Sequence, residues 1–291
     1  MFAKLLKYDM RALKKSGVPI LISLLAVTVL ASIFGFFAVS YLDRSVGTSE
    51  FADVMYGLVT MLLMFGGFFV MILFTMASTV MLVLVCVHFY KNTVSDEGYL
   101  TFTLPVTSNQ IIYSKTLSGF IWTVVIAVAS IVGMCIVFFT SMLGASEVAG
   151  ALGEAGEMLP DVYKELIMAE LNSAAVGIII LIVQAVIVGI ITIVFNLVLT
   201  YMSIFLGGVI AKKHKGLAAI GCVFGANALL RIISSIFSMV LLPLMFTVNT
   251  FGDMITSYNI TLFASILFYG GAGVGCFFIL KHMMDKKLNL N

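Results

Sequence analysis

Arg231 is the one charged residue that lies well inside a long apolar run of this 291-residue chain. A guanidinium keeps its charge in proteins and binds carboxylate or phosphate groups through paired hydrogen bonds. No acidic residue lies near Arg231 in the sequence, so its predicted partners are backbone carbonyls or three polar side chains, Gln184, Asn196 and Asn227. Two interpretations stay open: Arg231 lines a translocation path and meets an anionic substrate, or it fixes the packing of helices.

The other residue types that often carry chemistry do not form a recognisable site. The cysteines lie inside apolar runs without C-x-x-C spacing and are interpreted as packing residues: Cys86, Cys135, Cys222 and Cys276. The histidines lie near the ends of apolar runs, which argues against a haem held between two of them: His88, His214 and His282. We therefore expect no metal site and no bound cofactor in this chain.

Motifs of known enzyme classes are missing from the sequence. The chain contains neither H-E-x-x-H nor G-x-S-x-G, and it lacks the G-x-x-x-x-G-K-[ST] loop that holds nucleotide phosphates. The chain itself is therefore not expected to be an enzyme. If nucleotide energy drives this protein, another chain must supply it.

The elements that would position these residues are helices in a membrane. The chain is 62% hydrophobic and 10% charged with a mean hydropathy of +1.17, whereas soluble domains are roughly 25% charged. Apolar runs without alternation predict helices, because a lipid-exposed backbone must satisfy its own hydrogen bonds. We predict an all-α polytopic membrane protein, one transmembrane domain (1–291) with six spans at 18–41, 54–89, 114–143, 173–211, 217–248 and 260–280.

Two of the six runs are longer than a bilayer requires. At 1.5 Å per residue, the second and fourth runs would measure about 54 and 58 Å. They must tilt, break or extend beyond the membrane. Gly66 and Gly67 offer a break in the second run, and for the fourth run we favour an extension to Lys212.

Basic residues indicate the orientation of the spans. The two termini and alternate loops together carry 13 basic and four acidic residues, whereas the remaining loops carry two basic and ten acidic residues. Because lysine and arginine mark the cytosolic side, both termini are predicted to be cytosolic. The segment 1–17 also has an amphipathic pattern, with apolar positions such as Leu5 opposite basic positions such as Lys7.

An acidic loop at 144–172 is predicted on the extracytoplasmic side. It carries six acidic residues among alanines and glycines, and a short helix is predicted at 159–171. The loop either attracts a cationic peptide through its long-range field or is simply solvated.

The most structured polar segment is the predicted cytosolic loop 90–113. Ser95 fits a helix cap, and Asp96 and Glu97 fit the first turn of a short helix that ends by Pro105. Thr107 and Gln110 fit a capping box that begins a second helix, which continues into the third span. A helix fused to a span in this way could transmit motion from a soluble partner; the other interpretation is a helix resting on lipid headgroups.

This loop resembles the coupling loop of ABC-2 type transporter permeases. The resemblance rests on SDEGYLTFTLPVT and the following pair Ser114 and Lys115, together with the amphipathic start and the six-span layout. It implies an elbow helix at 1–17 and a coupling helix between spans two and three. The acidic segment is placed differently from that of many members, which leaves the substrate open.

The resemblance also implies a function and partners. The chain would be the permease subunit of a bacterial ATP-binding cassette exporter in the cytoplasmic membrane, paired with a second permease subunit as a homodimer or heterodimer. A separate cytosolic ATPase would bind ATP and Mg, and membrane lipid but no nucleic acid would be a further partner. The implied ATPase contacts are Tyr90, Lys91, Asn92, Asp96, Glu97, Gly98, Tyr99, Leu100, Phe102, Leu104 and Pro105. The alternative is a transporter or channel without an ATPase, or a membrane component of a sensing or resistance complex.

Overall fold

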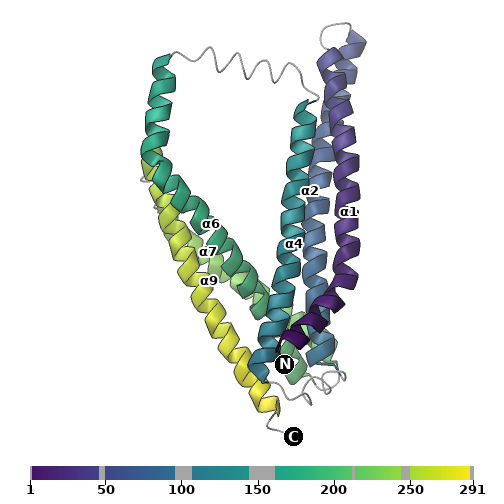
Figure 1. Cartoon of the computed structure of the whole chain (residues 1–291), viewed down its shortest axis with the longest axis vertical. Helices are drawn as coiled ribbons and strands as arrows, with labels where there is room; N and C mark the ends of the chain where they lie inside the picture. Colours follow the sequence, from purple (N-terminus) through teal and green to yellow (C-terminus); the bar gives the residue numbers. More distant parts are fainter. Residues whose placement is uncertain are drawn as a thin grey trace. The chain divides into compact units, whose positions relative to one another are not determined.

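The computed structural model describes residues 2–45, 50–95, 107–143, 161–211, 214–243 and 250–288. These residues contain no strand, which confirms the all-α prediction for this part of the chain. Six helices account for nearly all of them: α1 (Phe2–Ser45), α2 (Glu50–Thr93), α4 (Ser108–Leu143), α6 (Asp161–Ile210), α7 (Lys215–Leu241) and α9 (Phe251–Leu288) (Figure 1).

All six helices are long and apolar enough to cross a membrane. They range from 27 residues in α7 to 50 residues in α6, whereas ~20 residues suffice to cross the ~30 Å hydrocarbon layer. The described residues therefore contain as many helices able to cross a membrane as the sequence predicts, and these helices fit a multi-pass membrane protein.

The helices differ from the predicted runs mainly at their ends. α2 passes through Gly66 and Gly67 without interruption, so the predicted option of a break there is wrong. α6 already begins at Asp161, so the short helix expected at 159–171 is the start of a much longer one. α6 ends at Ile210, and residues 212–213 lie outside the described residues, as do residues 144–160 of the acidic loop.

The amphipathic segment predicted at 1–17 forms the start of α1 and not a helix of its own. α1 runs from Phe2 through Pro19 into the apolar segment. Proline lacks the amide hydrogen that would bond the carbonyl of Lys15, which weakens the helix at this point. The side chains of Leu5 and Leu6 are half-buried, and those of Lys4 and Lys7 are exposed, as the pattern predicts.

The chain divides into two compact units. One comprises residues 1–10, 85–120 and 162–291, and the other comprises residues 11–84 and 121–161. We call them unit 1 and unit 2, and each is described by itself.

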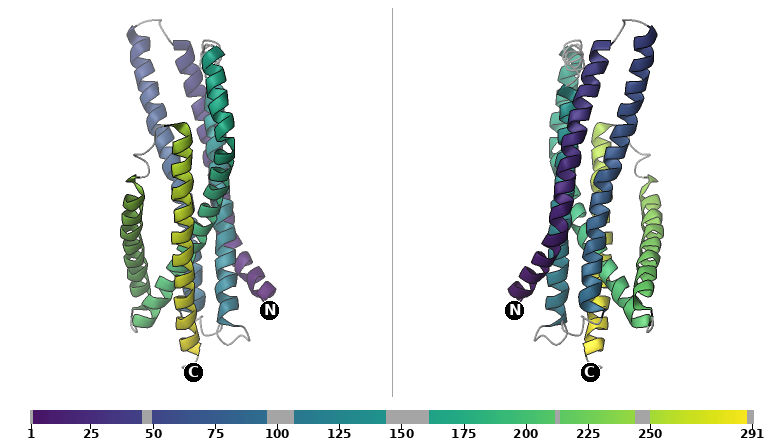
Figure 2. Two further views of the ribbon diagram at one scale, coloured as in Figure 1. Left: turned by 90° about the vertical axis from the view of Figure 1, so that its left-hand side faces the viewer. Right: turned by 90° about the vertical axis from the view of Figure 1, so that its right-hand side faces the viewer.

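Unit 2 is built from parts of three helices, α1, α2 and α4, that run alongside one another (Figure 1, Figure 2). Gly133 of α4 marks a close approach of all three. A Cβ atom at this position would lie 2.7 Å from Oγ1 of Thr28 on α1 and 2.9 Å from Cε1 of Phe74 on α2. Both of these side chains are buried, so the missing side chain of Gly133 allows the helices to pack closely.

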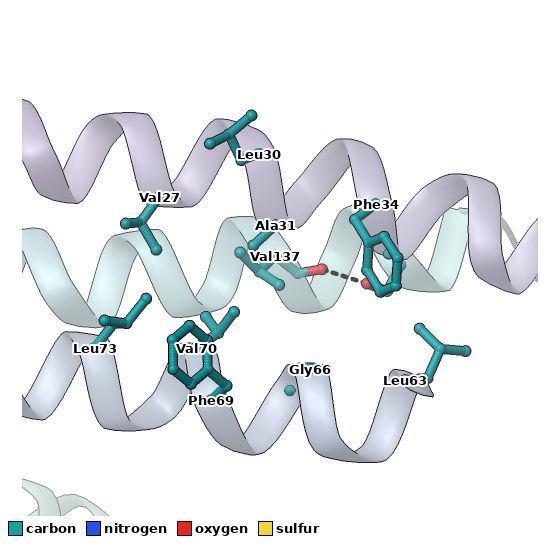
Figure 3. A pocket seen from close by; sticks show the side chains of 13 residues that line it. Val27, Leu30, Ala31, Phe34, Leu63, Gly66, Phe69, Val70, Leu73 and Val137 are labelled. Atoms are coloured by element: carbon teal, nitrogen blue, oxygen red, sulfur yellow. Dashed lines mark hydrogen bonds between the residues drawn. The ribbon is translucent and has the colours of Figure 1, made fainter. Parts of the chain in front are cut away.

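A cavity of about 350 Å³ opens between the same three helices. Figure 3 shows apolar side chains around it, among them Val27, Phe34 and Val70. Gly66 lines it too, and a Cβ there would lie 3.5 Å from the ring of Phe34. Gly66, where the sequence offers a break, thus leaves α2 intact and widens the cavity.

The core of unit 1 lies around the second half of α6. From Phe195 to Phe205 most side chains of α6 are buried on all sides. Completely or almost completely buried residues of the same unit also come from α2, α4 and α9: Phe89, Ile111, Ile112, Leu280 and Met284. A helix that is apolar all round is one surrounded by protein, so α6 is the central helix of this unit.

Two further contacts in unit 1 require glycine. The backbones of α6 and α7 meet at Gly207, where a Cβ would lie 2.5 Å from Cα of Ala219. Near the beginning of the apolar part of α6, a Cβ at Gly177 would lie 2.8 Å from Cγ2 of Ile255 on α9, and the Gly177 carbonyl accepts a hydrogen bond from the Asn259 side chain at 3.3 Å. These contacts set the paths of α7 and α9 along α6.

Candidate functional site

Asp9 lies in the apolar stripe of α1 and not among its basic residues. Leu5 precedes it by one helical turn and Leu13 follows it by one turn, so the three share a face. Asp9 is only 4% exposed, whereas Lys7 and Arg11 are exposed. Because an ionised carboxylate cannot be buried cheaply without partners, neighbouring helices must satisfy it.

Three donors from α2 and α4 surround the Asp9 carboxylate. The Ser114 hydroxyl donates to Oδ2 at 2.7 Å, and Nζ of Lys115 donates to Oδ1 at 3.3 Å. Nε2 of His88 lies 3.1 Å from the same Oδ1. One carboxylate therefore joins the start of α1 to the end of α2 and the start of α4. We call Asp9, His88, Ser114 and Lys115 the Asp9 cluster.

The Asp9 cluster balances its own charge. The Lys115 side chain is 3% exposed and forms a buried ion pair with Asp9. An ionised carboxylate only accepts hydrogen bonds, so Nε2 of His88 carries the hydrogen that it shares with Asp9. The side-chain amide of Asn92 lies 3.2 Å from the same ring nitrogen. Removing one charge of such a pair leaves the other buried alone, at a cost of about 3–5 kcal/mol.

Tyr201 of α6 connects the Asp9 cluster to the core of unit 1. Its hydroxyl donates a hydrogen bond to the backbone carbonyl of Lys115 at 3.2 Å. Its ring stacks on Phe89 of α2, with the ring centroids 4.1 Å apart and the planes at 12°. Gly119 leaves room for this hydroxyl, since a Cβ there would lie 2.9 Å from it. α6 thereby holds α2 and α4 together at the cluster.

The predicted loop 90–113 begins and ends beside the Asp9 cluster. His88 lies two residues before it, and Ser114 follows it directly. The second part of the loop belongs to α4, whose first amides, those of Gln110 and Ile111, donate to the carbonyl of Thr107 at 2.9 and 3.2 Å. As predicted, this helix then continues into the apolar segment without a break.

Three of the eleven residues predicted to contact an ATPase are described. Tyr90 is half-buried, with its ring beside Gly216 of α7, and Lys91 is exposed. Asn92 lies against His88. The other eight lie outside the described residues: Asp96, Glu97, Gly98, Tyr99, Leu100, Phe102, Leu104 and Pro105.

Arg231 and its predicted partners are not joined by hydrogen bonds. Arg231 is exposed on α7, and its side chain forms no hydrogen bond or ion pair with any residue that the structure describes. The amides of Asn196 and Asn227 donate to carbonyls one turn earlier in their own helices, at 2.8 and 2.9 Å. Oε1 of Gln184 is buried and has no hydrogen-bond partner in the part of the chain that the structure describes. Arg231 therefore faces the surroundings of unit 1.

The cysteines do not pair, and no metal site is found in the described residues. All four thiols are free. Within the described ranges, no three histidine, cysteine, aspartate or glutamate side chains come together as metal ligands. The polar contacts that stand out in this part of the chain are those of the Asp9 cluster.

Similarity to known proteins does not identify a family for this chain. No protein-family model, curated protein or solved structure matches it. The resemblance of loop 90–113 to ABC-2 permeases therefore stays a prediction. The role of loop 90–113 is therefore argued from the Asp9 cluster and from the helices that carry the cluster.

Sequence reasoning missed the Asp9 cluster, although its members carry a signal. Asp9, His88 and Lys115 lie near predicted ends of spans, and the two charged residues belong to the 13 basic and four acidic residues that indicate the cytosolic side. Yet Asp9 interrupts the apolar stripe of α1, and Lys115 interrupts the stripe of α4 that contains Ile111 and Trp122. A charge at a core position predicts a buried partner of opposite sign. The identity of that partner depends on how the helices pack.

Proposed function

We propose that this chain is the membrane-spanning permease subunit of an ABC-2 type ATP-binding cassette exporter. The observation that carries the proposal is the Asp9 cluster, which ties the start of α1 to both helices that border loop 90–113. A loop that receives force from a soluble ATPase must have both of its ends held firmly. A buried ion pair with two further donors supplies such an attachment.

The helices on either side of the loop can carry a displacement into the membrane. α2 reaches the loop after 44 residues without a break, and α4 leaves it as a continuous helix of 36 residues. Continuous helices transmit force because every turn is hydrogen-bonded to the next. Tyr201 and Phe89 stack between α6 and α2, so movement of the loop would also reach the central helix of unit 1.

The proposal assigns the chemistry to a separate chain. A cytosolic ATPase binds ATP and Mg and hydrolyses the nucleotide, while this chain and a second permease subunit form the path through the bacterial cytoplasmic membrane. Both termini then lie in the cytosol, as the distribution of basic residues predicts. Peptides, antibiotics and lipids stay open as substrates.

A paired substitution in the loop tests the proposal. We expect Tyr99→Ala with Phe102→Ala to remove most of the apolar surface available for docking, because aromatic residues dominate such contacts. The protein is purified from its native membrane, P-loop ATPases in the preparation are identified by mass spectrometry, and ATP hydrolysis is measured after reconstitution. The unmodified chain should copurify with one such ATPase, and the double variant should lose it together with the hydrolysis.

The matched control removes the same two side-chain types elsewhere. Tyr258 and Phe263 are exposed on α9, and their change to alanine should leave the ATPase bound. If the loop variant retains the ATPase and normal hydrolysis, the coupling role is wrong. If no ATPase accompanies the unmodified chain, a transporter, channel or sensing component without ATPase becomes the better interpretation.

A further inference from the structure

A second feature of unit 1 is an apolar groove of about 510 Å³ between α4, α6 and α9. We call it the α6–α9 groove. Its walls are almost entirely aliphatic and aromatic, including Ile190, Val198, Val274 and Phe278. Its volume lies within the roughly 300–1,000 Å³ typical of ligand pockets. None of its lining residues belongs to the Asp9 cluster.

Glycines leave the groove open along α9. A Cβ at Gly270 would meet no described atom within 4 Å, and one at Gly273 would lie 3.5 Å from the ring of Phe195. Two aromatic pairs border the groove, Phe195 with Tyr269 at 5.7 Å and Tyr113 with Phe277 at 5.2 Å between ring centroids. At Gly270 and Gly273, α9 itself projects no side chain into the groove.

Polar groups gather at the end of the groove where Tyr113 lies. Thr116 lines the groove, and its hydroxyl is buried without a hydrogen-bond partner among the described residues. Lys281 follows Phe277 by one helical turn on the same face of α9 and is half-buried. His282 and Lys286 are exposed nearby on α9, and Asp285 is the acidic residue on the same turns. Lysine side chains outnumber acidic side chains at this end of the groove, so its net positive charge attracts anionic groups.

We propose that the α6–α9 groove binds one anionic phospholipid. An acyl chain occupies the slot beside Gly270 and Gly273, an ester carbonyl accepts the hydroxyl hydrogen of Thr116, and the phosphate pairs with Lys281. A buried hydroxyl without a hydrogen bond is costly in apolar surroundings, so any acceptor that reaches it lowers the free energy. Basic pockets between membrane helices recognise anionic headgroups in this way.

The charge at one end of the groove favours a lipid over a helix of a second copy. A single cationic end combined with an apolar slot also matches an amphiphile with an anionic head.

Two leucine substitutions on neighbouring residues provide the test. Gly270→Leu places a side chain in the slot, whereas Gly271→Leu places the same side chain on the exposed side of α9, where a Cβ also meets nothing within 4 Å. Detergent-purified protein is incubated with vesicles of phosphatidylglycerol and phosphatidylcholine in equal amounts. The retained lipid is then counted by native mass spectrometry. The unmodified protein and Gly271→Leu should retain phosphatidylglycerol, and Gly270→Leu should not.

A second variant separates headgroup recognition from filling of the slot. Lys281→Gln should lower the preference for phosphatidylglycerol over phosphatidylcholine about fivefold, because it removes one phosphate contact. Lys286→Gln, on the exposed side of α9, should change the preference less.

Equal retention by the two leucine variants, or equal retention of both lipids by the unmodified protein, would overturn the proposal. So would a dimer that dissociates only in Gly270→Leu, because the groove would then hold a second copy. None of these readouts requires an ATPase.

Discussion

At Asp9 a single side chain decides how three helix ends are held together. Its carboxylate accepts from Ser114 of α4 and lies within 3.3 Å of Lys115 and 3.1 Å of His88. Buried ion pairs contribute little net stability over apolar residues of the same shape, but breaking one is costly. The cluster is therefore better suited to fixing one arrangement of the helices than to raising overall stability.

Asp9→Asn should destabilise the protein strongly. The amide keeps the shape of the carboxylate but leaves the Lys115 ammonium buried without a counter-charge, so we expect a loss of about 3–5 kcal/mol in the free energy of unfolding. Adding Lys115→Met should restore most of it. Unfolding in mild detergent, followed by circular dichroism, measures both effects. Asp285→Asn is the control and should change stability by less than about 0.5 kcal/mol. Equal losses for Asn at the two positions would contradict the buried pair.

Gly119→Ala should lower stability although alanine favours helices. The new methyl group would lie 2.8 Å from Cγ1 of Val85 and 2.9 Å from the Tyr201 hydroxyl oxygen, and such overpacking costs about 1–3 kcal/mol. Gly225→Ala has open space around it and should gain up to about 1 kcal/mol. Thermal unfolding of the two variants distinguishes the signs. A gain at both positions would show that the Tyr201 contact with α4 is looser than described.

At the scale of elements, the spacing of small residues does not by itself decide where helices approach closely. Gly271 and Gly275 have the four-residue spacing of helix-packing motifs, yet a Cβ at either would meet no described atom within 4 Å. Gly207 has the same spacing from two other small residues, Ser203 and Ala211, and it does contact the backbone of α7 directly. The spacing motif permits close packing, and the path of the neighbouring helix decides whether it happens.

Gly207→Ala should separate α6 from α7. Its Cβ would lie 2.5 Å from Cα and 2.6 Å from N of Ala219, and no change of rotamer relieves a clash with backbone. We expect a loss of at least about 1–3 kcal/mol, measured by thermal unfolding. Gly221→Ala, on α7 itself, has open space and serves as the control. If the two variants unfold at the same temperature, the contact between α6 and α7 is not as close as the structure shows.

At the scale of the whole molecule, the division into two units does not follow the loops. Most of the boundaries lie inside continuous helices, after Met10 of α1, before Val85 of α2 and after Phe120 of α4. The sequence predicts one transmembrane domain because composition does not change at these points. A helix that contributes different parts to two cores carries an apolar pattern throughout.

Labelling of single cysteines tests the orientation of the whole chain. In a background without the four native cysteines, Lys7→Cys and Lys286→Cys should react only with a reagent that reaches the cytosol, because lysine-rich ends translocate poorly. Ser146→Cys in the acidic loop should react with an impermeant reagent in intact cells. Labelling of Lys7→Cys from outside would indicate the opposite orientation. Loop 90–113 would then lie on the side of the membrane where no ATP is available.

Sequence alone was enough to find the six helices, because length and hydropathy are summed along each segment independently of its neighbours. It also located the start of α4 at Thr107, where the capping residues are local signals. It could not pair Asp9 with His88, Ser114 and Lys115, which lie 79, 105 and 106 residues away. Nor could it show the α6–α9 groove. Partners and empty space depend on which helix faces lie against each other, and only the tertiary packing decides that.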